Sequence, residues 1–202
     1  MDEIKEKNYR ERELISIDFF SIAESHIHAT AVCKKYAHFR VDHIRRVYKI
    51  ACRLANGYRG IDYEKIKVMC AIHDMFKYTN TENHGECAAK YLKEFFIDTY
   101  FPNDSIEKLE WYNVIEALRH HSDKNMITNN QNAYLAILMD ADMLDKIHIQ
   151  HVTSLRGIFK PQKTIKEVMD ECVEEVNRYN GLSIKYETIK SDMRNALVRA
   201  IK

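Results

Sequence analysis

An all-α fold is predicted for this chain of 202 residues. Five glycines and two prolines are few for this length, whereas the helix-forming residues Lys, Glu, Leu and Ala are plentiful. Apolar residues also recur at spacings of three and four, which is the period of an amphipathic helix. Since a chain of this length can bury one sizeable core, we expect a single-domain helical bundle over residues 1–202.

Turn-forming residues divide the first part of the chain. Helices within residues 1–37 are expected to precede a helix over 42–55, which the pair Asn56-Gly57 ends. The carboxylate of Asp62 can then accept hydrogen bonds from the first free amides of the next helix, as an N-cap does.

Capping residues also set the later boundaries. Thr79 and Glu82 have the spacing of a capping box, which predicts a helix over 79–96, and the same reasoning predicts one over 104–121. The polar segment 123–132 is expected to be a loop.

The segment 133–148 is apolar nearly all round, so we expect this helix at the centre of the bundle. Thr164 and Glu167 form another capping-box pair, and Gly181 separates their helix from a final one. The chain is therefore expected to end in two helices over 164–202.

Charge and cysteine content restrict the partners. A formal net charge of +1 gives no reason to expect nucleic acid or an anionic membrane. The charged start MDEIKEKNYRERE has no apolar core of a signal peptide, and the longest apolar run, 133–139, is too short to span a bilayer. The five scattered cysteines suggest a reducing compartment. We therefore expect a cytoplasmic protein with a small-molecule partner, and exposed aromatic helices are compatible with a homodimer.

Four side chains stand out as metal ligands, namely His43, His73, Asp74 and Asp142. His43, His73 and Asp142 each continue the apolar stripe of a predicted helix, and Asp74 directly follows His73. The stripes are Val47, Ile50 and Leu54 after His43; Ile66, Met69 and Cys70 before His73; and Leu135, Leu138 and Met139 before Asp142. A carboxylate on an apolar face needs a partner or a bound cation, because burying an unpaired charge is costly. Imidazole and carboxylate together suit a divalent ion such as Mn, Fe, Co, Ni or Zn.

These residues resemble the pattern of the HD-domain metal-dependent phosphohydrolases, which is a histidine, a His-Asp doublet and a distant aspartate. The similarity covers about residues 38–157 and includes the segments DHIRRV, AIHDMFK, ENHGECAAKYL, ALRHHS and MDADMLDKI. It implies a helical bundle of the HD-domain type in which His43, His73, Asp74 and Asp142 bind a divalent ion, with Mg added to the candidates above. It also implies hydrolysis of a phosphate ester or phosphoanhydride, with a nucleotide as the expected substrate.

Two choices arise within these segments. The resemblance and the apolar stripe both favour Asp142 over Asp140 as the ligand, which leaves Asp140 behind the ligands or on the helix surface. Asp145 could orient the site, but pairing with a neighbouring lysine or a place on the solvent face is the favoured interpretation. The stripe before the His-His pair likewise favours His121 over His120.

Further residues are expected to act on the substrate. His84 and His121 could bind substrate phosphate or hold a second ion, as in similar proteins. Lys77 occupies a position where one branch of the family has glutamate, and as a cation it could bind phosphate and stabilise charge developing on phosphorus. Arg46, one turn after His43, is a further candidate for phosphate binding. Asp74, or a nearby free carboxylate, is the expected acceptor of the water proton.

Two other functions stay open. The same ligands could serve a non-catalytic sensor of metal and nucleotide, or a dinuclear-iron protein with oxygen-dependent chemistry. The pocket walls that select the substrate are expected among aromatic and apolar residues, namely Phe76, Tyr78, Tyr91 and Met143.

Overall fold

A computed structural model describes residues 13–14, 16–101, 106–123 and 132–201. Within these ranges the chain forms helices and no strand, which confirms the all-α prediction. The elements are α2 (Phe19–Thr30), α3 (Lys34–Ala55), α4 (Tyr63–Ile72), α5 (His84–Leu92), the π-helical turn η1 (Lys93–Ile97), α6 (Asp98–Tyr100), α7 (Ile106–His120), α8 (Ala133–Asp145), α9 (Ile149–Ile158), α10 (Ile165–Arg178) and α11 (Tyr186–Ile201).

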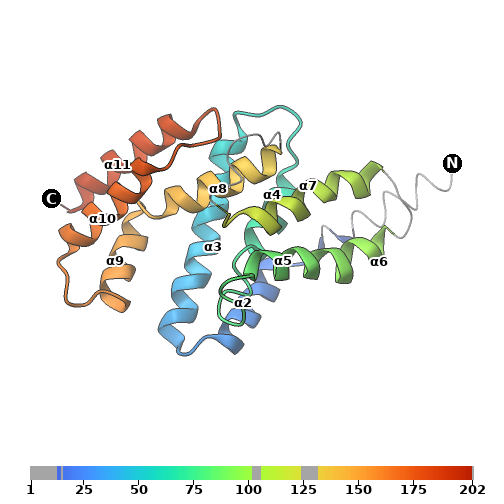
Figure 1. Ribbon diagram of the computed structural model, residues 1–202, viewed down its shortest axis with the longest axis horizontal. Helices are drawn as coiled ribbons and strands as arrows, with labels where there is room; N and C mark the ends of the chain where they lie inside the picture. Colours follow the sequence, from blue (N-terminus) through green and yellow to red (C-terminus); the bar gives the residue numbers. More distant parts are fainter. Residues whose placement is uncertain (1–12, 15, 102–105, 124–131, 202) are drawn as a thin grey trace.

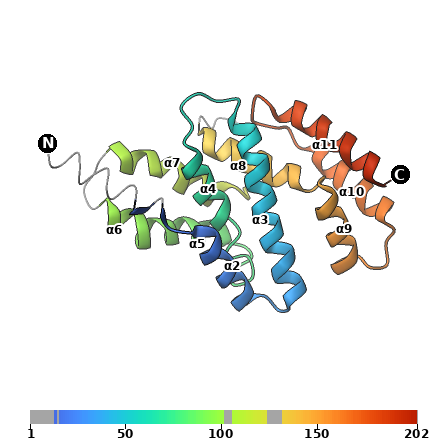
Figure 2. The same cartoon turned by 180° about the vertical axis from the view of Figure 1, so that it is seen from behind.

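The helices α3 and α8 pack against each other at the centre of the molecule. The C-terminal helices α9, α10 and α11 lie on one side of α3, and α5 and α7 lie on the other (Figure 1, and from behind in Figure 2). Most of α8 is buried, as its apolar sequence predicts. This helix ends at Asp145 rather than at 148, because the His148 side chain accepts a hydrogen bond from the Gln150 amide and caps α9 instead.

Several helix boundaries follow the predicted capping residues. The Asp62 carboxylate accepts hydrogen bonds from the first amides of α4. Thr164 and Glu167 form the predicted capping box at the start of α10. The long helix α3, however, begins at Lys34 and not near residue 42, so it starts well before the first predicted ligand, His43.

The predicted helix start at Thr79 is wrong. The Thr79 hydroxyl donates to the Phe76 carbonyl of the preceding turn, and the Thr81 hydroxyl donates to Lys77 in the same way. Since these hydroxyls are used by the turns that follow α4, α5 begins only at His84. His84 therefore lies in the first turn of α5, beside the end of α4.

Two predicted features fall on residues outside the described ranges. The predicted helix start at 104 and most of the predicted loop 123–132 lie there. Helix α7, which follows residues 102–105, ends at His120, close to its predicted end at 121. None of the helices in the described ranges is long and apolar enough to cross a membrane.

Candidate metal centre

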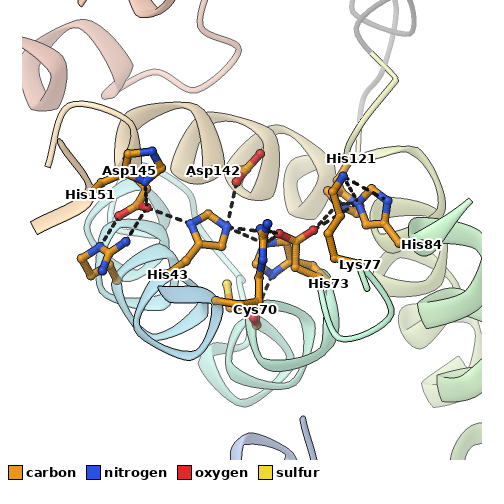
Figure 3. A network of polar contacts seen from close by, with 12 residues as sticks. His43, Cys70, His73, Lys77, His84, His121, Asp142, Asp145 and His151 are labelled. Atoms are coloured by element: carbon orange, nitrogen blue, oxygen red, sulfur yellow. Dashed lines mark hydrogen bonds and ion pairs between the residues drawn. The ribbon is translucent and has the colours of Figure 1, made fainter. Parts of the chain in front are cut away.

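The four predicted ligands converge from three helices, as Figure 3 shows for His43, His73 and Asp142, which it labels. His43 lies on α3, His73 and Asp74 follow α4, and Asp142 lies on α8. The Nε2 atom of His43 is 3.1 Å from Asp142 Oδ1, 3.4 Å from Asp74 Oδ2 and 3.3 Å from His73 Nε2. We call these four residues the His43 cluster.

A second group meets the other oxygen of Asp74. Asp74 Oδ1 is 3.1 Å from His84 Nε2 and 3.8 Å from His121 Nε2, and the two Nε2 atoms are 3.1 Å apart. We call Asp74, His84 and His121 the His84 cluster. His120 instead contacts Glu116, so the choice of His121 agrees with the structure.

The close packing of α5 on α7 brings the two histidines of the His84 cluster together. A Cβ atom on Gly85 would lie 2.6 Å from the carbonyl oxygen of Leu118 and 3.0 Å from that of Arg119, which is closer than side chains allow. Only glycine fits at this position. A larger residue would push α5, and with it His84, away from His121.

The hydrogen bonds of the histidines show which nitrogen is free to bind a cation. In His73, His84 and His121 the Nδ1 atom lies 2.7 to 2.9 Å from the backbone carbonyl of the residue three positions earlier. A carbonyl can only accept, so each Nδ1 carries a hydrogen and Nε2 is the nitrogen that can offer a lone pair to a cation. These lone pairs face one another and the carboxylate of Asp74. Because they repel unless a positive charge lies between them, the donor set fits bound cations.

The charges in the His43 cluster support the same interpretation. Burial lowers the pKa of His43, but hydrogen bonds with Asp142, Asp145 and Asp74 outweigh it and raise that pKa to about 10. Burial lowers the pKa of His73 to about 4, so this ring is neutral. The surrounding carboxylates thus stabilise a positive charge at His43 Nε2. A proton supplies this charge when no metal ion is bound.

Asp145 holds His43 from behind. This carboxylate is fully buried and accepts from His43 Nδ1 at 2.8 Å, His151 Nδ1 at 2.9 Å and Arg46 Nε at 2.7 Å. The predicted pairing with a neighbouring lysine or place on the solvent face is therefore wrong, because this side of α8 faces α3 and α9. Asp145 fixes the His43 ring with Nε2 directed at the cluster, as carboxylates behind metal-binding histidines do.

Asparagine at position 145 is expected to lower metal affinity by about 10- to 100-fold, because it removes the carboxylate that orients His43. Titration of the metal-stripped variant with Mn or Zn measures this change. The matched control is Asp192→Asn, since Asp192 also pairs with an arginine, Arg53, but lies exposed on α11. Equal affinity in the two variants would exclude an orienting role for Asp145.

Arg46 was predicted to bind substrate phosphate, but it does not line the cavity. Its guanidinium donates two hydrogen bonds to Asp145, and this position argues against direct contact with substrate. The arginine that lines the cavity is Arg40, which pairs with Asp74 and was missed. Its place three residues before His43, on the same face of α3, is the sequence signal that could have identified it.

A cavity of about 440 Å³ opens over both clusters. Its lining includes Lys77 as predicted, whose Nζ is 3.4 Å from His84 Nδ1. The expected walls Phe76, Tyr78, Tyr91 and Met143 do not line it. The lining residues are Phe39, Arg40, His43, Asp74, Lys77, His84, His121, Ser122, Asp142, Lys146, His151, Leu155 and Phe159.

Asp140 forms hydrogen bonds with the segment between α10 and α11. It is fully buried and accepts hydrogen bonds from the Tyr179 hydroxyl and from the amides of Leu182 and Ser183. The two expected places for Asp140, behind the ligands or on the helix surface, are therefore both wrong. The two aspartates of the MDAD segment, Asp140 and Asp142, face opposite sides of α8, because positions two residues apart on a helix are rotated by about 200°.

Comparison with known proteins adds one match. A family model described as HD domain matches residues 40–147, which is more than half of the chain. All residues of the His43 and His84 clusters lie in this range, whereas α9, α10 and α11 lie beyond it. No curated protein and no solved structure gives a significant match.

Proposed function

Because the chain belongs to the HD domain family, we propose that it is a phosphohydrolase that uses divalent metal ions to cleave a phosphate ester or phosphoanhydride, with a nucleotide as the substrate. The observation that carries this proposal is the sharing of Asp74 between two clusters of imidazole and carboxylate groups at the floor of one cavity. Such a floor suits phosphate chemistry, which depends mainly on position and charge.

We assign one ion to the His43 cluster and a second to the His84 cluster, with one Asp74 oxygen directed at each. Nitrogen and oxygen donors of this kind suit Mn, Fe, Co, Ni or Zn, and Mg is a weaker fit because it prefers oxygen alone. When bound, the ions would activate water and polarise the phosphoryl oxygen.

The residues around the cavity would supply the remaining steps. Lys77 and Arg40 line it and can neutralise phosphate oxygens, Lys77 also as charge develops on phosphorus. Asp74 was the predicted proton acceptor, but Arg40 and four imidazoles surround its two oxygens. The Asp142 side chain is 33% exposed and lines the same cavity, and only its Oδ1 atom pairs with His43, so we assign proton acceptance to the second oxygen of Asp142 instead.

The proposal is tested by a screen for phosphate and pyrophosphate release. Metal-stripped protein is supplied separately with Mn, Co, Ni, Mg, Zn or Fe(II) and offered nucleoside mono-, di- and triphosphates, cyclic nucleotides and inorganic polyphosphates. We expect metal-dependent release from one class of phosphate compound. Metal and nucleotide binding without turnover would favour the sensor instead, and oxygen uptake by the iron-loaded protein would favour the oxygen-dependent alternative.

Alanine at position 121 is expected to reduce the bound metal from two ions to one per chain, because it removes a donor of the His84 cluster only. Elemental analysis of the variant after metal loading and desalting measures this. His120→Ala is the matched control, since His120 is the adjacent histidine and contacts Glu116 outside both clusters. A single ion in the wild-type chain, with a raised KM in the His121 variant, would instead assign the His84 cluster to substrate phosphate.

A further inference from the structure

One side of the cavity is apolar, although phosphate and metal chemistry do not need an apolar surface. Phe39, Leu155 and Phe159 form this side, which we call the apolar wall. Leu155 lies on α9 and Phe159 is the residue that ends it, so both lie beyond the part of the chain that matches the HD family model. The family core therefore does not account for them.

The ring of Phe159 is exposed and held in place. Its exposed fraction is 41%, unusual for a phenylalanine that lines a polar cavity. Tyr36 stacks on it with ring centroids 4.8 Å apart and planes 24° apart, and Phe39 contacts it edge-on at 5.2 Å. Tyr36 covers one face of the ring, and the exposed part of Phe159 lines the cavity, where it can contact a planar ligand.

The cationic side chain of Arg40 lies between the apolar wall and the clusters. The Arg40 guanidinium carbon is 5.9 Å from the centre of the Phe39 ring, and the same guanidinium pairs with Asp74. Lys77 and Lys146 also line the cavity. A ligand that reaches from the wall to the clusters thus meets first an aromatic surface, then positive charge and then the metal-binding residues. The cavity volume of about 440 Å³ lies in the usual range for small-molecule sites.

We propose that the exposed part of the Phe159 ring stacks on the base of a nucleoside phosphate whose phosphate groups reach the His43 cluster. This inference rests on the proposed hydrolase function and adds to it the residue that would recognise the base of the nucleotide. A planar base can stack on the ring, and the charged phosphates can pair with the cationic side chains beyond it. Phe159 is then a specificity-determining residue that acts on substrate affinity and not on the reacting atoms.

The kinetic test compares a nucleoside triphosphate with inorganic tripolyphosphate, which carries the same phosphates and no base. Alanine at position 159 is expected to raise KM for the nucleotide about 10-fold, or about 1.4 kcal/mol, and to leave kcat and the tripolyphosphate kinetics unchanged. The matched control is Phe95→Ala, because Phe95 is also an exposed phenylalanine but does not line the cavity. Equal changes for both substrates, or none for the nucleotide, would overturn the assignment.

A binding test keeps this inference separate from the hydrolase proposal. The chain has one tryptophan, Trp111, which is fully buried, so a Phe159→Trp variant gains one exposed reporter in the cavity. We expect a non-hydrolysable nucleoside triphosphate analogue to quench its fluorescence and tripolyphosphate to have little effect. Quenching without turnover by the wild-type protein would support the stacking site and reject the hydrolase. Turnover of inorganic or other base-free phosphates alone, without quenching, would support the hydrolase and reject the stacking site.

Discussion

Asparagine in place of Asp74 is expected to abolish turnover while the chain stays folded. Asp74 directs one oxygen at His43 and the other at His84, so its loss removes a shared donor from both clusters. Loss of the bound ions removes several kcal/mol of transition-state stabilisation. We therefore expect kcat to fall by at least about 1,000-fold, which corresponds to roughly 4 kcal/mol.

Metal content and fold are measured on the same Asp74→Asn sample. Elemental analysis should show loss of both ions, and circular dichroism should show unchanged helix content, because asparagine keeps the volume of the side chain. Asp170→Asn is a matched control, since Asp170 is exposed on α10 and far along the chain from the ligands. Wild-type metal content together with lost turnover would mean that Asp74 acts in catalysis and not as the shared ligand.

The positions of the candidate metal ligands could be predicted because helical spacing determines which side chains face the core. His43 and His73 lie on the buried faces that their stripes predict, and both are nearly or fully buried. Asp142 likewise faces the cavity and not the C-terminal helices. The apolar stripe of a helix, however, does not indicate which other helix packs against that helix. The family resemblance was therefore needed to bring the three segments together.

The residues that were missed depend on contacts between helices. The three partners of Asp145 come from α3 and α9, and no spacing within α8 indicates them. His151 could not be placed because α8 ends before it and α9 runs in a new direction. The apolar wall was missed for the same reason, since Phe39 and Phe159 are far apart in the sequence and meet only through the packing of α9 on α3.

Local competition between hydrogen bonds explains the wrong helix start at Thr79. A capping-box spacing predicts a helix only if the threonine side chain points toward the amide three residues on and accepts a hydrogen bond from it. Here the hydroxyl donates backward to Phe76, within the consecutive turns that follow Asp74. Those turns also place Lys77 beside the cavity, so the irregular segment belongs to the site and not to the helix.

Alanine in place of Asp140 is expected to lower the free energy of unfolding by about 3 kcal/mol. The fully buried Asp140 carboxylate accepts from the Tyr179 hydroxyl at 2.8 Å and from the amides of Leu182 at 3.0 Å and Ser183 at 2.6 Å. Alanine leaves all three donors without this acceptor, and each unsatisfied buried group costs about 1–3 kcal/mol before water enters. Urea denaturation followed by circular dichroism measures the change.

Two comparisons separate this structural role of Asp140 from the metal-binding role assigned to Asp142. Tyr179→Phe removes one of the three donors and not the acceptor, so it should cost only about 1 kcal/mol. The folded Asp140→Ala protein should also bind as much metal as the wild type, because Asp140 faces the segment between α10 and α11 and contributes to neither cluster. A variant with wild-type stability and reduced metal content would reverse the two roles. It would place Asp140, and not Asp142, among the ligands.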